Sequence, residues 1–197
     1  MTIEKRKFIQ FIAVSGVALA LAACGGGGDD GTAAGSGGGT GGGATGTLTI
    51  TGVNNLPDAA SGLTPDAGLP GAGQSAASAL GSTGLNLVIA SLVNNNLRFM
   101  SAPLSGTTPV ALGSSFNIVV DGGPAQGSVM VLTATPVGSA SGYFYSSASG
   151  VAKVTALSAT SVDLLFTNVT LKATVGATGQ LATGQVILNG TVTVKRV

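Results

Sequence analysis

The sequence predicts an all-β domain that begins near Thr47. From there onward, short runs of alternating apolar and polar residues recur, bounded by Gly, Pro, Asn or Ser. Alternation of this kind places successive side chains on opposite faces of a strand. The polar positions are mostly Ser, Thr, Asn and Gly, and only 8% of the 197 residues are charged. Exposed helices usually carry Glu, Lys and Arg, so this composition indicates strands rather than helices.

The composition also excludes several classes of function. The chain contains no histidine and one cysteine, so it can form neither a Ser-His-Asp site nor an internal disulfide framework nor a thiolate zinc cluster. Its formal net charge is +1, and beyond Cys24 five basic residues stand against six aspartates. A chain without a basic surplus does not attract nucleic acid or anionic lipid headgroups. We expect no cofactor and no nucleic-acid partner.

Residues 1–23 predict a secretory signal peptide. Residues 1–7 are net basic, and residues 8–23 are largely apolar and end in the small residues Ala22 and Ala23. A basic start, a short apolar region and small residues before a cleavage point define such a signal. The apolar region has 16 residues, fewer than the roughly 20 that a membrane-spanning helix needs.

The residues Leu21-Ala22-Ala23-Cys24 resemble the lipobox of bacterial lipoproteins, and the resemblance covers the first 24 residues. It implies that a diacylglycerol is joined to the Cys24 thiol, that the signal is removed just before Cys24, and that the new amino group is often acylated. Because each buried methylene contributes about 0.8 kcal/mol, two or three acyl chains hold a protein at a membrane. Gly25 and Gly26 further imply transfer to the outer membrane of the cell envelope.

Residues 24–46 predict the lipidated cysteine followed by a flexible linker. Of the 22 residues from 25 to 46, 13 are glycine, and no large apolar side chain stands among them. Such a segment has nothing to bury and behaves as a random coil with an r.m.s. span of about 25 Å. A phosphate-binding glycine loop would need a strand before it and a helix after it, and the sequence offers neither.

Beyond the linker, residues 47–197 predict the β domain, with residues 54–84 mostly as loop. Within that loop, residues 74–80 also fit two turns of helix that stop at Gly81. In the run 162–175 the apolar set changes parity between Phe166 and Val169, which requires a bulge near Thr167 and Asn168. The expected strands are 47–51, 85–92, 97–100, 116–120, 128–135, 143–145, 151–157, 162–175 and 185–197.

Strands of this number and spacing predict a single antiparallel sandwich, immunoglobulin-like in arrangement, or a small barrel. Their uneven lengths favour the sandwich. In the last strand, Val192 and Val194 are expected to face the core, while Thr191, Thr193 and Lys195 face solvent. That strand can be stable only if it pairs inside the sheet.

The titratable residues form no recognisable catalytic or metal-binding motif. Lys153 and Lys172 lack a serine three positions earlier, and hydrolysis by paired carboxylates would have to use aspartates of turns or strands. These candidates are Asp58, Asp66, Asp121 and Asp163. Asp58 and Asp66 each stand in a Pro-Asp-Ala sequence that is typical of turns, although the pair also suggests a weak calcium site. We therefore expect neither an enzyme nor a metal site.

Tyr143, Phe144 and Tyr145 form an aromatic cluster, and on a strand the two tyrosines share a face. Two interpretations are open. Either the tyrosines coat the sheet while Phe144 packs in the core, or they form a binding surface that stacks on a sugar or anchors a protein partner.

The sequence thus predicts a lipid-anchored protein of the bacterial cell envelope, with a structural or protein-binding role and an envelope protein as its partner. The alternative is a module that binds a glycan or a small apolar ligand, and a hydrolase is the third hypothesis. A deep apolar pocket would favour the ligand-binding module, whereas a filled core would favour the protein-binding role.

Overall fold

The computed structural model describes residues 45–65, 75–94, 96–120, 126–134, 142–174 and 179–197. The predicted signal peptide, Cys24 and the linker up to residue 44 lie outside these residues. Within them the chain forms nine strands and one short 3-10 helix. Their bounds are β1 (Thr45–Thr51), η1 (Ala59–Ser61), β2 (Ala76–Leu80), β3 (Gly84–Val93), β4 (Asn96–Ser105), β5 (Ser115–Val119), β6 (Met130–Ala134), β7 (Gly142–Leu157), β8 (Ser161–Ala173) and β9 (Gln185–Arg196).

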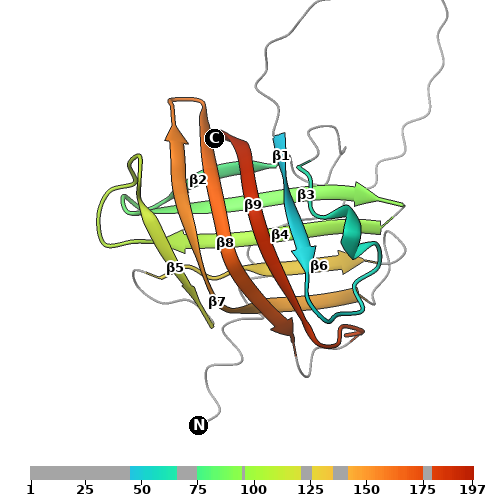
Figure 1. Ribbon diagram of the computed structural model, residues 1–197. Helices are drawn as coiled ribbons and strands as arrows, with labels where there is room; N and C mark the ends of the chain where they lie inside the picture. The colour runs from blue at the N-terminus through green and yellow to red at the C-terminus, as the bar shows by residue number, and fades with distance from the viewer. Residues whose placement is uncertain (1–44, 66–74, 95, 121–125, 135–141, 175–178) are drawn as a thin grey trace, which may run out of the picture. The chain divides into compact units, whose positions relative to one another are not determined.

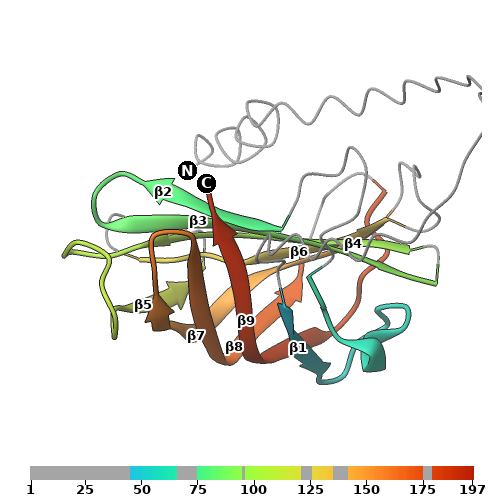
Figure 2. The ribbon, with the colours of Figure 1, turned by 90° about the horizontal axis from the view of Figure 1, so that it is seen from above.

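The strands form one curled, mixed sheet in the shape of a half-barrel (Figure 1). β2, β3, β4 and β6 make one layer, and the remaining strands make a second layer that runs across it (Figure 2). Strand pairs are antiparallel except for β2 and β9, which pair in parallel at Ala76 with Lys195 and at Ala77 with Arg196. The prediction of an all-β domain is confirmed, and the sheet differs from the expected antiparallel one at this contact.

Two long strands, β7 and β9, connect the layers. β7 pairs with β8 along one edge, while its other edge pairs first with β6 and then with β5. β9 likewise pairs with β8 along one edge, and with β1 and then β2 along the other. Each long strand of the second layer therefore also pairs with a strand of the first, and the core lies between the two layers.

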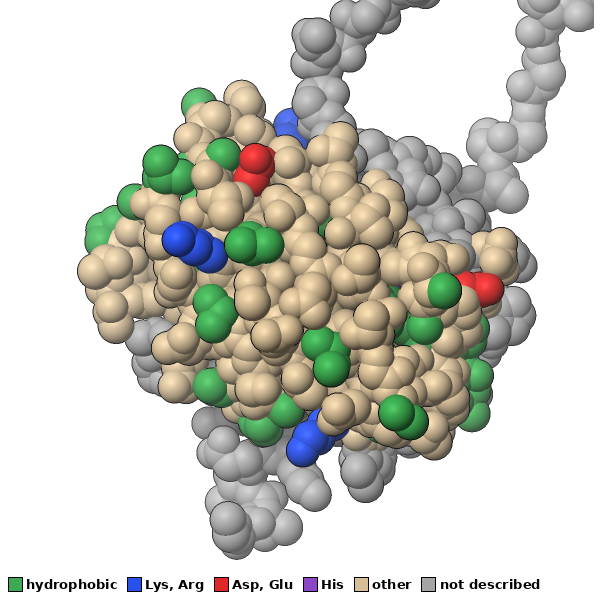
Figure 3. Space-filling view, viewed as in Figure 1, with side chains coloured by type: hydrophobic (Ala, Val, Ile, Leu, Met, Phe, Trp, Pro, Cys, Tyr) green, Lys and Arg blue, Asp and Glu red, His purple; other side chains and the backbone are tan. Residues whose placement is uncertain are grey.

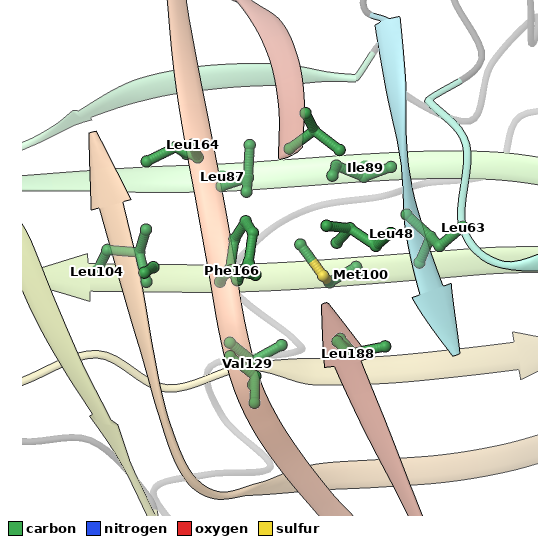
Figure 4. Close-up of a cluster of buried hydrophobic side chains, with 14 of the residues drawn as sticks. Leu48, Leu63, Leu87, Ile89, Met100, Leu104, Val129, Leu164, Phe166 and Leu188 are labelled. Atoms are coloured by element: carbon green, nitrogen blue, oxygen red, sulfur yellow. The ribbon is translucent and has the colours of Figure 1, made fainter. Parts of the chain in front are cut away.

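The core is built from the inward face of each strand. In β9 the predicted alternation is confirmed: Val192 and Val194 are buried, Thr191 and Lys195 are exposed, and Thr193 is half-buried. β9 is also an interior strand, as predicted. Figure 4 shows aliphatic side chains from both layers meeting around Phe166 and Met100. The space between the layers is thus occupied by the protein's own side chains.

The predicted bulge in β8 is confirmed. The register between β8 and β9 shifts between Phe166 and Val169, and both of these side chains face the core. Asn168 has a φ of +47°, and its N–H donates to Asn189 Oδ1 at 2.7 Å. Asparagine tolerates this left-handed conformation better than most residues, so it absorbs the change of parity.

Two predictions about strands were wrong. Residues 76–80 form β2 instead of loop or helix, because they pair with β3 across the turn at 81–83 and bury Ala77. Hairpin pairing here outweighs the helix propensity of alanine. The expected strands 143–145 and 151–157 are the two ends of the single strand β7, which has 16 residues. The serine-rich run between them stays in the sheet through register shifts against β8.

Candidate functional site

The aromatic cluster of β7 has the opposite orientation to the one in which the tyrosines coat the sheet and Phe144 packs in the core. Tyr145 is fully buried, Tyr143 is half-buried against the same core, and Phe144 lies half-buried on the opposite face of β7. The prediction that the tyrosines lie on the surface is therefore wrong for Tyr145. Its hydroxyl finds hydrogen-bond partners at one end of the core, so the ring can be buried without leaving a polar group unpaired.

The other candidate residues do not converge. Asp66 and Asp121 lie outside the described residues, as Cys24 does. Lys153 and Lys172 are exposed on β7 and β8, and Asp163 is half-buried on the outward face of β8. Asp58, in contrast, joins a polar cluster at one end of the core, whose other members the sequence did not predict.

This cluster joins residues 52–65, which we call the strap, to the rest of the domain. The strap follows β1, contains η1 and connects to several strands of both layers (Figure 1). Its residues Leu56 and Leu63 are buried in the core. Leu63 and Leu48 exchange two backbone hydrogen bonds of 2.8 and 3.0 Å, and Asn54 forms a single bridge with Gly184. The strap thus supplies part of the core without forming a strand of its own.

Arg98 is the largest fully buried side chain of the described residues. It lies on the inward face of β4 between Asn96 and Met100. Its Nη2 donates to the Pro57 carbonyl at 2.6 Å, and its Nη1 donates to the Gly62 carbonyl. Its Nε is buried and has no partner within the described part of the chain. The guanidinium is therefore held by two neutral carbonyls of the strap.

The electrostatics of Arg98 are set by its burial. Burial lowers the pKa of Arg98 from its ordinary value, and the negative charge of Asp58 opposes that shift. Because an arginine stays protonated at any physiological pH, a positive charge lies under the strap. A buried charge costs free energy unless it is paired, so a negative partner in contact with the guanidinium would stabilise it.

Asp58 attaches the strap to the hairpin of β3 and β4. Its Oδ1 accepts a hydrogen bond from Asn94 Nδ2 at 3.0 Å, and its Oδ2 accepts one from Asn96 Nδ2 at 3.1 Å. Asp58 and Asn94 have positive φ angles of 53° and 46°. A left-handed conformation costs roughly 1–2 kcal/mol for a non-glycine residue, so these contacts hold two strained residues together.

Asn55 attaches the strap to the segment before β9. Its Nδ2 donates to the Leu181 carbonyl at 2.9 Å, and its Oδ1 accepts from the Thr183 N–H at 2.8 Å. The Tyr145 hydroxyl lies 3.1 Å from the same Asn55 Oδ1 and 3.0 Å from the Thr183 carbonyl oxygen. Burial raises the pKa of the Tyr145 phenol. Asn55 therefore links the strap, the core and residues 181–183.

The interior changes from polar to apolar below the strap. The register partner of Arg98 on β3 is Ser91, which is also buried, and the next inward pair is Met100 with Ile89. Leu63 of the strap lies beside Leu48 and belongs to the same hydrophobic cluster as Ile89 and Met100 (Figure 4). Arg98, whose Nε has no partner among the described residues, thus lies at the boundary between a polar layer and an aliphatic core.

The outer face of β1 and β9 has a different character. Thr45, Thr47, Thr49 and Thr51 are exposed on β1, and Thr45 and Thr47 lie opposite threonines of β9. The hydroxyls of Thr49 and Thr51 donate to β9 carbonyls at 2.9 and 3.4 Å. Figure 3 shows this side of the molecule with only scattered charged side chains. The face is broad and polar but carries little charge.

These arrangements limit the chemistry of the site. Within the described residues, no three His, Cys, Asp or Glu side chains lie close enough together to hold a metal ion. The helices of the described part include none that is long and apolar enough to cross a membrane. The Arg98 cluster is suited to holding an anion, because it offers positive charge and hydrogen-bond donors.

The sequence carried only an ambiguous signal for Arg98. In the predicted strand 97–100, Arg98 and Met100 share one face and Leu97 and Phe99 share the other. Both faces contain apolar residues, so the alternation does not decide whether Arg98 is buried. The roles of Asn55 and Asn96 had no such signal, because they depend on contacts with distant segments.

Comparison with known proteins finds no protein family, no curated relative and no solved structure that matches this chain.

Proposed function

We propose that the chain is a lipid-anchored protein of the bacterial cell envelope, with acyl chains on Cys24 and a β domain that has a structural or protein-binding role. The observation that carries the proposal is Leu21-Ala22-Ala23-Cys24 at the end of a signal-like segment, with the single cysteine of the chain at the modification point. Gly25 and Gly26 support delivery to the outer membrane. The linker then separates the membrane from the domain.

The β domain supports a binding role more than a catalytic one. Aliphatic side chains of both layers fill the core, and the outer face of β1 and β9 is broad with little charge. Removing uncharged surface from water costs less than removing charged groups. Such a face is suited to lie against an envelope protein.

Of the two architectures predicted from the sequence, we infer a small barrel that closes where β2 meets β9. The pairings lead from β9 through β2, β3, β4, β6, β7 and β8 and return to β9. Val197 N–H also donates to the Ala77 carbonyl at 2.9 Å across this contact. Slow hydrogen exchange at the Val197 amide is the expected result, and exchange as fast as in an unfolded peptide would mean an open sheet.

The lipid anchor is tested by metabolic labelling with palmitate in a bacterial host. Cys24→Ser is expected to abolish the label and to leave the uncleaved precursor. Thr32→Ser in the linker is the matched control and should label like the parent chain. Undiminished labelling of Cys24→Ser would contradict the proposal.

The protein-binding role has a separate test. Co-purification of the parent chain from detergent-solubilised envelopes would identify the protein partner.

A further inference from the structure

We propose that the strap covers a binding site for a medium-chain carboxylate, with Arg98 as the site of the carboxylate head and the aliphatic core below it as the site of the tail. In the unliganded protein the strap itself fills this site. The inference goes beyond the proposed function, which assigns no small ligand to the domain.

The head site follows from what Arg98 lacks. Among the described residues its hydrogen-bond acceptors are the carbonyls of Pro57 and Gly62, which carry no net charge, and its Nε finds no acceptor there. A carboxylate would accept from Nε and one Nη together and would neutralise the buried charge. Asp58 does not serve in this way: its negative charge acts on Arg98, but among the described residues its hydrogen bonds go to Asn94 and Asn96 and none joins it to the guanidinium. The chemistry of Arg98 therefore fits an anion better than the present carbonyls.

The tail site follows from the leucines of the strap. The carbonyls that hold Arg98 belong to Pro57 and Gly62. A buried leucine is the direct neighbour of each in the chain: Leu56 precedes Pro57, and Leu63 follows Gly62. Two leucine side chains contain about eight carbons, which a chain of similar length can replace in a close-packed core. The surroundings of Leu63 are apolar, since they include Leu48 and Met100 (Figure 4). The strap thus places polar and apolar groups where an amphiphile would place its head and tail.

The strap is held to its neighbours by few backbone hydrogen bonds. Leu63 exchanges two with Leu48 of β1, and the Gln185 N–H of β9 donates one to the Val53 carbonyl at 2.8 Å. Side chains such as Asn55 and Asp58 make further contacts. Strands of the layers are instead held by continuous ladders. Displacement of the strap would therefore leave the sheet intact.

The test is a titration of the full chain carrying Cys24→Ser with octanoate, followed by NMR and amide hydrogen exchange. Saturable binding is expected, with octanol and octyltrimethylammonium binding at least about tenfold more weakly because they lack the anionic head. Octanoate should also accelerate exchange at the Leu48 and Leu63 amides, which lose each other's carbonyls when the strap leaves.

Variants separate the head from the tail. Arg98→Met should weaken octanoate binding at least about tenfold, while Lys153→Met, which removes an exposed cation of β7, should leave the affinity unchanged. Leu63→Ala should tighten binding, because it weakens the competing strap. If Arg98→Met does not fold, two measurements still test the proposal. These are the relative affinities of octanoate, octanol and octyltrimethylammonium for the chain with Arg98 intact, and the affinity of Leu63→Ala for octanoate.

Three results would overturn the proposal. The first is the absence of octanoate binding by both the parent chain and Leu63→Ala. The second is equal affinity for octanoate and octanol, which would leave Arg98 without a role. The third is binding that leaves exchange at Leu48 and Leu63 unchanged, which would place the ligand elsewhere and make the strap a permanent part of the core.

Discussion

Two regions of the domain are held in place by different interactions. One is the meander of β7, β8 and β9, and the other is the N-terminal segment that consists of β1 and the strap. β8 pairs along nearly its whole length with β7 on one side and β9 on the other. β1 pairs with β9 through a ladder on one edge only. The strap depends on isolated backbone bonds and on side chains such as Arg98 and Asn55. The meander is thus stabilised by ladders on both sides of β8, and the strap by individual contacts.

The difference has a physical cause. Buried backbone groups need hydrogen-bond partners, and a regular strand finds them in its neighbours. The strap has an irregular backbone, so side chains of β4 have to supply donors to its carbonyls. Long polar side chains can release such contacts one at a time, whereas a ladder is lost cooperatively. We therefore expect the meander to set the global stability and the strap to open locally.

The largest expected loss of stability is that of Val192→Asp in β9, which tests whether the meander sets the global stability of the domain. Val192 is fully buried between the layers, and an unpaired carboxylate there should lower the free energy of unfolding by more than about 4 kcal/mol. Thr193→Ser, at the next position and half-buried on the outer face, should change it by less than about 0.5 kcal/mol. Urea denaturation of the chain from residue 25 onward measures both. Similar effects of the two variants would mean that the register of β9 is wrong.

Two leucine truncations compare the regions directly. Leu164 of β8 and Leu63 of the strap are both fully buried. Leu164→Ala should lower the global free energy of unfolding by about 2–5 kcal/mol. Leu63→Ala should mainly lower the free energy of local opening, so the Leu48 and Leu63 amides exchange faster while the β8 amides keep their protection. Uniform acceleration throughout the domain in Leu63→Ala would show that the strap and the meander unfold as one unit.

A glycine pair tests how tightly β1 is attached to β9. Gly46 and Gly113 have similar φ angles of +93° and +88°. A Cβ on Gly46 would meet the Thr191 carbonyl oxygen, whereas a Cβ on Gly113 would meet nothing within 4 Å. Both alanine variants carry the strain of a positive φ, about 1–2 kcal/mol, and Gly46→Ala adds the clash. We expect Gly46→Ala to lower stability by at least about 1 kcal/mol more than Gly113→Ala in urea denaturation. Equal losses would indicate that β1 already lies loosely on β9.

The same contrast explains which features the sequence could predict. The strands of the meander carry their own signal, because alternation and the change of parity at Phe166 and Val169 are local patterns. β2 has only alanines and serines with a terminal leucine, so its strand form depends on β3. The inward position of Tyr145 depends on Asn55 and Thr183, which are far from it in the sequence.

The candidate site was less accessible to prediction than the fold. Asp58 could be singled out as a titratable residue in a turn, but its partners Asn94 and Asn96 belong to a different hairpin. The carbonyls that hold Arg98 are backbone groups, and their placement has no signature in residue type. Contacts made by one side chain with an irregular segment appear only when the chain is folded.

The smallest expected effect concerns Tyr145, where the core of the meander meets the strap. At pH 7, Tyr145→Phe should lower the free energy of unfolding by about 1 kcal/mol, because the hydrogen bonds to Asn55 and Thr183 are lost. Burial raises the pKa of Tyr145 above its ordinary value of about 10, so above that pH the unfolded chain releases this proton while the folded chain retains it. The stability of the parent chain should therefore fall as the pH rises from about 10 toward the raised pKa of the folded state, and the Phe variant should lack this contribution. The two stability curves, measured by urea denaturation between pH 7 and 11, should approach each other at the alkaline end. Parallel curves would mean that the Tyr145 phenol is as free to ionise in the folded domain as in the unfolded chain, and that the strap does not seal this end of the core.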